Sequence, residues 1–200
     1  AYDQQLMKDA LAKYPQFQKA VDELRGTKAT PATQGAVFGT FAGTRLLVEG
    51  AMAYIAQVGD SRAYLIRKQK IYQLTKDQSL VQALIDSGRI QPEEAHRYPN
   101  NVITQAIGAD ATVRPALHQL VLQRNDYLLI CSDGLSNKVS DEEMQQIVRA
   151  SISLDVACRR LVNLANDRGG EDNITVIIAR FDGEALNSSS RHSNNLRKAS

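Results

Sequence analysis

Three aspartates lie at the ends of apolar segments, where their carboxylates could bind a metal ion. Asp60 stands between two such segments in Val-Gly-Asp-Ser-Arg, Asp133 follows one in Ile-Cys-Ser-Asp-Gly, and Asp172 precedes one in Glu-Asp-Asn-Ile-Thr. A carboxylate at the end of a buried strand loses hydration and needs a compensating charge. Several converging carboxylates suit a hard divalent cation such as Mg²⁺ or Mn²⁺. Taken singly, each aspartate is more simply interpreted as a turn residue, because Gly-Asp, Asp-Gly and Asp-Asn are common turn pairs.

The elements that must position these aspartates begin with a run of strands. Short segments rich in Val, Ile, Leu, Tyr and Phe are separated by glycines and other turn residues: 36–42, 45–49, 51–58, 62–67 and 71–74. Such closely spaced segments favour antiparallel meanders. Asp60 then lies in the turn between the third and the fourth strand.

Helical periodicity appears on either side of this run. Residues 2–24 have apolar residues at roughly helical spacing, broken by Pro15. A second helix is expected from Ser79 to a stop at Gly88, followed by a short helix over residues 92–96. The polar, irregular stretch up to residue 116 is typical of a flap over a site.

The last third predicts two helices between strands. Segments 117–122, 127–131 and 174–179 have strand character, and 127–131 is apolar on both faces and therefore expected at the centre of a sheet. Ser140 and Glu143 form a capping-box pattern that opens one helix, and a second amphipathic helix covers 154–166. We expect one domain over residues 1–183 and a disordered tail or linker over 184–200, where Ser, Asn and Arg dominate.

Composition narrows the classes of function. The chain has 200 residues with a net charge of +2 and no Trp, so neither a basic face nor a base-stacking platform for nucleic acid is expected. Two cysteines without a disulfide framework favour a cytoplasmic setting. Segments of about 20 apolar residues are lacking, so no membrane span is expected within the chain.

Five motifs, in this order, resemble those of the metal-dependent protein phosphatases of the 2C type. They are Val-Gly-Asp-Ser-Arg-Ala-Tyr-Leu, Leu-Thr-Lys-Asp-Gln-Ser-Leu, Ile-Thr-Gln-Ala-Ile-Gly, Asp-Tyr-Leu-Leu-Ile-Cys-Ser-Asp-Gly-Leu and Ala-Asn-Asp-Arg-Gly-Gly-Glu-Asp-Asn-Ile-Thr-Val. The resemblance covers residues 36–181, and residues 75–108 are similar to the flap region of that family.

The resemblance implies an α+β fold, an α-β-β-α sandwich of two antiparallel sheets flanked by helices. It also implies hydrolysis of phosphoserine and phosphothreonine on phosphoproteins, the substrates of Ser/Thr kinases, by water activated on two Mn²⁺ or Mg²⁺ ions. By motif matching, Asp133 and Asp172 would be direct metal ligands. Asp60 would share a third, weaker ion with Asp133.

Other residues near the motifs carry weaker implications. The family usually has His after the aspartate that matches Asp77, whereas this chain has Gln78. We expect Ser61 and Arg62 to tie down their own turn rather than touch substrate. Arg168 could point at a phosphate, but a solvated helix end is the simpler interpretation. His96 and His118, without partners at ligand spacing, are expected to be surface or structural residues.

The opening motifs of the family are not found before Thr27. These would supply the phosphate-binding Arg, a Glu, a bridging Asp and the candidate general acid, so we assign no catalytic residue here. The chain is expected to be either a fragment of a longer phosphatase or a shortened member, and to have little activity alone because a half-site cannot organise a two-metal mechanism. The alternative is a pseudophosphatase, a regulatory or binding module that retains the fold without the chemistry.

Overall fold

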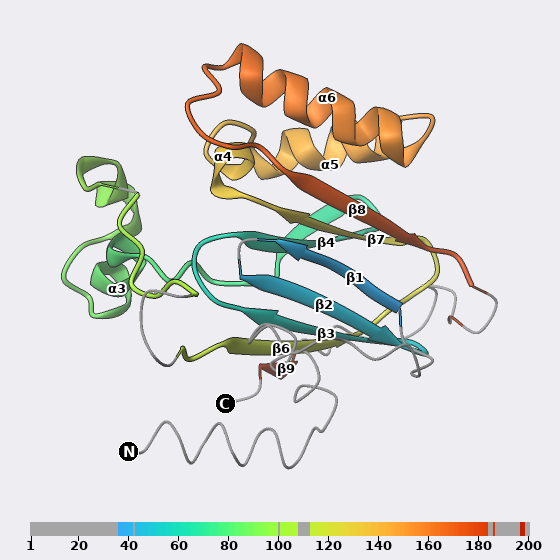
Figure 1. Cartoon of the computed structure of the whole chain (residues 1–200), viewed down its shortest axis with the longest axis horizontal. Coiled ribbons are helices and arrows are strands. Elements are labelled where there is room, and N and C mark those ends of the chain that lie inside the picture. Colours follow the sequence, from blue (N-terminus) through green and yellow to red (C-terminus); the bar gives the residue numbers. More distant parts are fainter. Residues whose placement is uncertain are drawn as a thin grey trace.

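Two antiparallel sheets lie face to face, with helices on the outer face of one of them (Figure 1). The computed structural model describes residues 36–41, 43–99, 101–107, 113–183, 186 and 197–198, with the first and last ranges described as backbone strands only. The two sheets and their flanking helices confirm the predicted fold class. The helix expected over residues 2–24 lies outside the described residues.

The first sheet has five strands in the order β1-β2-β3-β6-β9. They are β1 (Ala36–Phe41), β2 (Thr44–Glu49), β3 (Met52–Gln57), β6 (Ala116–Val121) and β9 (Arg197–Lys198). Strands β1 to β3 form the expected meander. Gly43 joins β1 to β2 at φ +102°, and a Cβ there would lie 2.0 Å from the carbonyl oxygen of Val58. Only glycine therefore allows this turn to receive the hydrogen bond from the Val58 amide to its carbonyl, at 2.8 Å.

The second sheet has four strands in the order β5-β4-β7-β8. They are β5 (Lys70–Gln73), β4 (Arg62–Arg67), β7 (Asp126–Cys131) and β8 (Val176–Phe181). β7 lies between β4 and β8, which confirms the central position expected from its apolar residues on both faces. The register places Arg62, Cys131 and Val176 in one row across β4, β7 and β8. All three predicted metal ligands lie just beyond this row.

The main core fills the space between the sheets. It is formed by inward-facing apolar side chains such as Leu46, Ile55, Leu65 and Ile130. Leu186, which lies within the predicted tail, is also buried in this core. The two residues of β9, near the end of the same tail, pair with β6. The boundary between domain and tail remains a prediction.

Three helices cover the outer face of the second sheet and form a second core with it (Figure 1). They are α4 (Asp133–Ser136), α5 (Asp141–Ala150) and α6 (Leu154–Asp167). The predicted capping box is confirmed: the Glu143 amide donates to the Ser140 hydroxyl, and the Glu143 carboxylate accepts from the Ser140 amide. The single turn α4 was not expected, because four residues are too short for a helical period to show.

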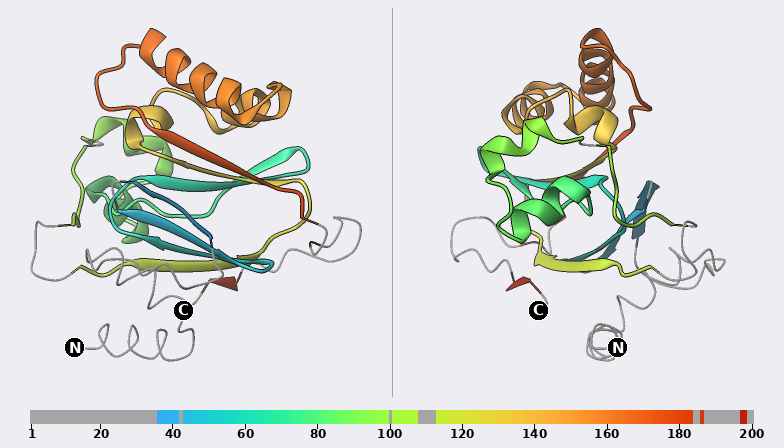
Figure 2. Two further views of the ribbon diagram at one scale, coloured as in Figure 1. Left: turned by 45° about the vertical axis from the view of Figure 1, so that its right-hand side comes forward. Right: turned by 90° about the vertical axis from the view of Figure 1, so that its left-hand side faces the viewer.

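The flap stands at one end of the sandwich, on the left of Figure 1 and facing the viewer in the right-hand view of Figure 2. It consists of α3 (Leu80–Asp86), which Ser79 caps, and the short 3-10 helix η1 (Pro92–Arg97), both close to their predicted positions. The Leu80 amide donates to the Val102 carbonyl, and Ser79 forms a bridge with Ile103. These contacts fold the flap back onto its own base.

Candidate metal centre

A cavity of about 500 Å³ lies between the flap and the ends of the strands. Its walls come from the turn after β3, the segment that leads into the flap, the flap itself and α4. Asp60 and Asp133, predicted as metal ligands from motifs far apart in the sequence, both line it. The structure therefore brings two of the three predicted ligands to one place.

The environment of Asp60 opposes its negative charge. Burial raises the pKa of Asp60 above its ordinary value, and the charge of Asp133 raises it further, with a smaller contribution from Asp77. The Arg62 guanidinium acts in the opposite direction. Half-buried carboxylates that repel one another are stabilised by a cation between them, so this pair fits a hard divalent ion.

The turn that carries Asp60 is held from beneath by buried side chains. The amide nitrogen of Gln57, a fully buried residue at the end of β3, donates to the carbonyls of Gly59 (2.9 Å) and Ser61 (3.3 Å). The Thr44 hydroxyl donates to the same Ser61 carbonyl at 3.2 Å. Ser61 is itself buried, and its carbonyl accepts from both of these side chains.

Arg62 reaches beyond its own turn to the segment that leads into the flap. Its guanidinium donates two hydrogen bonds to the Asp77 carboxylate, at 2.9 and 2.7 Å, and a third to the Tyr64 hydroxyl at 3.3 Å. Tyr64 is fully buried, and this burial raises the pKa of its hydroxyl. Arg62 is thus committed to protein groups and fixes Asp77 at the edge of the cavity.

Asp133 is positioned by hydrogen bonds of the preceding residue, Ser132, to residues 173–175, a set of contacts that we call the latch. Its carboxylate accepts from the Gly134 amide at 2.9 Å. The hydroxyl of Ser132 donates to the Asn173 carbonyl (2.9 Å) and accepts from the Thr175 amide (3.1 Å). A Cβ on Gly134 would lie 2.6 Å from the Asn173 carbonyl oxygen, so α4 and residues 173–175 are in close contact.

Asp172 lies in the segment held by this latch but not in the cavity wall. It is exposed, and its carboxylate accepts from the Asn173 amide at 2.6 Å. Within the described part of the chain, no three His, Cys, Asp or Glu residues are grouped closely enough to hold a metal ion. The structure thus places Asp60 with Asp133 and leaves Asp172 on the adjacent segment.

Arg168 does not point at the cavity. Its guanidinium forms an ion pair with the Glu143 carboxylate at 2.6 Å and donates to the Lys138 carbonyl at 2.7 Å. The pair lowers the pKa of Glu143 to about 2. Arg168 therefore ties the end of α6 to the start of α5, and the phosphate interpretation finds no support in its position.

Sequence reasoning missed several residues of the cavity wall. Ser136 and Asn137 follow Asp133 by one helical turn, and this spacing on α4 could have indicated them. His96, expected to be a surface or structural residue, is exposed but also lines the cavity together with Tyr98. Its Nδ1 is 2.7 Å from the Glu93 carbonyl oxygen. No spacing signal linked these flap residues to Asp60.

Comparison with known proteins identifies a family and several relatives of this chain. A family model described as Protein phosphatase 2C matches residues 3–84 and 93–174. The protein phosphatase PhpP of Streptococcus pneumoniae is 44% identical over 133 residues, which are 66% of this chain and 54% of PhpP. The chain spans about half the length of the curated relatives it matches.

Solved structures of serine/threonine phosphatases are also similar to this chain. The serine/threonine phosphatase of S. agalactiae has a TM-score of 0.66 and 38% identity, over 70% of this chain and 58% of that one. The catalytic domain of the phosphatase PstP, solved in complex with two manganese ions, has a TM-score of 0.62 and 38% identity, over 70% of this chain and 58% of its own.

Proposed function

Because the chain belongs to the protein phosphatase 2C family, we propose that the whole protein of which it forms part hydrolyses phosphoserine and phosphothreonine esters on phosphoproteins. The observation that carries this proposal is the meeting of Asp60 and Asp133 in one cavity beneath the flap. Matching relatives are named as serine/threonine phosphatases, which supports the same reaction for this chain.

The proposed cofactors are two Mn²⁺ or Mg²⁺ ions, with a third in the position nearest Asp60. When bound, such ions lower the pKa of a coordinated water and offset charge on the phosphoryl oxygens. Asp133 and Asp172 would contribute carboxylates from the two segments that Ser132 joins. Asp60 would add a carboxylate from the turn that Gln57 supports. The manganese ions in the PstP structure support this choice of metal.

Proposed partners are phosphorylated protein substrates of a Ser/Thr kinase, encountered in the cytoplasm. The cavity is bordered by exposed flap residues such as Tyr98, where a polypeptide that carries the phosphorylated side chain would contact the protein. Cys131 and Cys158 are free thiols, which fits a reducing compartment. No helix of the described residues is long and apolar enough to cross a membrane.

A pseudophosphatase is the second candidate, and one observation favours it. Asp77 and His96 also line the cavity, but Asp77 is paired with Arg62, and among the residues that the structure describes no three His, Cys, Asp or Glu are grouped closely enough to hold a metal ion. A chain with this arrangement could retain the phosphoprotein-binding surface and lack turnover. The two candidates differ in their response to metal.

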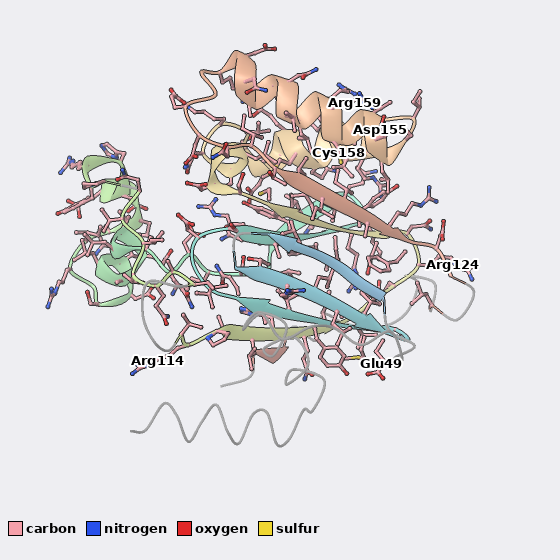
Figure 3. All side chains as sticks on the ribbon, in the orientation of Figure 1. Glu49, Arg114, Arg124, Asp155, Cys158 and Arg159 are labelled. Carbon is pink, nitrogen blue, oxygen red and sulfur yellow. The ribbon has the colours of Figure 1, made fainter. Side chains whose placement is uncertain are left out.

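Titration with Mn²⁺ by calorimetry tests the proposal on this chain. We expect micromolar binding to wild type that is lost in Asp133→Asn, which retains an oxygen acceptor for the Gly134 amide. Asp155→Asn is the matched control, since Asp155 lies on the outer surface of α6 (Figure 3), remote from the cavity. If Mn²⁺ binds neither this chain nor the whole protein, the phosphatase proposal fails and the pseudophosphatase remains.

A further inference from the structure

We propose that Gln78 is a positioning residue that fixes the Asp60 carboxylate in the cavity. It does so by hydrogen-bonding Gly59, the residue before Asp60, and by joining the Asp60 turn to the base of the flap. The inference rests on the proposed function, because it gives Asp60 its role at a metal ion. The motif that contains Gln78 assigned it no role, and its contacts account for what the glutamine does here.

Gln78 holds the Asp60 turn through both its backbone and its side chain. Its side-chain oxygen accepts from the Gly59 amide at 2.8 Å, and its backbone amide donates to the Gly59 carbonyl at 3.0 Å. Both polar groups of Gly59 are thereby bound to one residue. Gly59 has φ +100°, a conformation that glycine adopts without strain.

The other groups of Gln78 face the flap. Its carbonyl accepts from the Thr104 amide at 2.7 Å, and its side-chain nitrogen donates to the Arg114 carbonyl at 3.3 Å. Gln105 holds Arg114 as well: its side-chain oxygen accepts from the Arg114 amide at 2.8 Å. Figure 3 shows Arg114 just before β6, at the side of the sandwich where the flap stands. Gln78 therefore joins the Asp60 turn to both Thr104 and Arg114, which follow the flap helices in the sequence.

The two hydrogen bonds between Gln78 and Gly59 matter because the Asp60 turn must hold its carboxylate near that of Asp133 despite the repulsion between them. Asp60 and Asp133 line the same cavity, and a free turn would relieve the repulsion between their like charges by moving the Asp60 carboxylate into water. Gln57 holds the turn from beneath and Gln78 holds it from the flap side. Without Gln78, the carboxylate would have to be reordered whenever a cation binds, which weakens binding.

Mn²⁺ titration of the 200-residue chain, combined with amide hydrogen exchange, tests this inference. Gln78→Leu removes the acceptor and donor of the side chain, and Gln78→Asn keeps its polarity but shortens it by one methylene. Gln146→Leu, at an exposed glutamine of α5, is the matched control. We expect both Gln78 variants to bind Mn²⁺ about five- to tenfold more weakly, the factor of one hydrogen bond. We also expect faster exchange at the Gly59 amide with the thermal midpoint close to wild type, and no change in the control.

The outcomes separate this inference from the function on which it rests. If wild type binds Mn²⁺ in an Asp60-dependent way and both Gln78 variants bind equally well, the inference fails and the proposed function stands. Unchanged protection of the Gly59 amide in the variants also overturns it, whatever the metal does. If wild type binds no Mn²⁺, both the metal site and this inference fail, and the wild-type measurement alone reveals it.

Discussion

Arg67 and Asp126 form a two-bond ion pair at the end of the second sheet opposite the cavity, with the Asp126 side chain only 1% exposed. The guanidinium also donates to the Val121 carbonyl at 2.8 Å, and the carboxylate accepts from the Gln123 amide at 2.7 Å. The pair thus joins β4 and β7 to the end of β6, in the other sheet. Both oxygens of the buried Asp126 carboxylate accept hydrogen bonds, which is what a buried charge requires.

Replacing Asp126 by Asn should destabilise the fold strongly, because the Arg67 charge then lacks a counter-ion. We expect a loss of about 3 kcal/mol in the free energy of unfolding, the lower end of what is found for breaking buried pairs. Urea unfolding measures this. Asp155→Asn breaks an exposed pair with Arg159 and should leave the midpoint unchanged. Similar midpoints for the two variants would contradict the structural role of the Arg67–Asp126 pair.

Replacing Gly43 by Ala should disturb the strand that leads to the Asp60 turn. The new Cβ would lie 2.0 Å from the Val58 carbonyl oxygen and would impose φ +102° on an L residue. We expect a loss of about 2–4 kcal/mol, in the range found for strain at special backbone positions. Gly50→Ala is the control, since Gly50 also has positive φ but has nothing within 4 Å of the added Cβ. Its loss should be about 1 kcal/mol, and equal losses would rule out the steric explanation.

The ion pair between Glu143 and Arg168 predicts a dependence on pH. The pKa of Glu143 is lowered from 4.5 to about 2, mainly by the hydrogen bond from Arg168. A depressed pKa in the folded state means that the pair stabilises the fold above about pH 4.5 and loses this contribution as the pH falls toward 2. NMR titration of the Glu143 carboxyl checks the value. In Arg168→Gln the pKa should return toward 4.5, and a wild-type pKa already near 4.5 would show that the pair does not form in solution.

Replacing Ser132 by Ala should loosen the latch between α4 and residues 173–175. The change removes a donor to the Asn173 carbonyl and leaves the Thr175 amide without its acceptor. We expect a loss of about 2 kcal/mol and faster hydrogen exchange at the Thr175 amide. Ser87→Ala is the control, because its hydroxyl bonds the Leu84 carbonyl on the exposed part of the flap. Retained protection of the Thr175 amide in the Ser132 variant would show that the Ser132 hydroxyl does not hold residues 173–175 in solution.

Sequence patterns predicted the regular elements well because each of those signals is local. The apolar run of β7 indicated a central strand, and Ser140 with Glu143 indicated the start of α5, and both are confirmed. The one-turn helix α4 could not be predicted because its four residues are too few to show the periodic spacing of apolar residues that indicates a helix. Leu186 was assigned to a tail by the polar residues around it, although it packs into the core between the sheets.

Side-chain partners distant in sequence could not be predicted in this way. Asp77 and Arg62 both lie in recognised motifs. Neither motif indicates that the Asp77 carboxylate accepts two hydrogen bonds from the Arg62 guanidinium. Gln78 was noted only as a departure from the related sequences. Its role depends on the flap returning past Thr104 and Arg114, which is a tertiary contact. The metal-ligand roles of Asp133, Asp172 and Asp60 remain predictions.

The row formed by Arg62, Cys131 and Val176 sets where this chain can change in length. Each aspartate lies a short, fixed number of residues beyond that row. The pairing of the strands therefore determines how far apart the carboxylates lie. One residue inserted between Cys131 and Asp133 would turn the carboxylate away from Asp60. The turns at Lys68-Gln69 and Arg124-Asn125 lie at the opposite ends of the same strands. Insertions there would leave this spacing intact, so variation in loop length can accumulate at one end of the sheet while the other end stays constant.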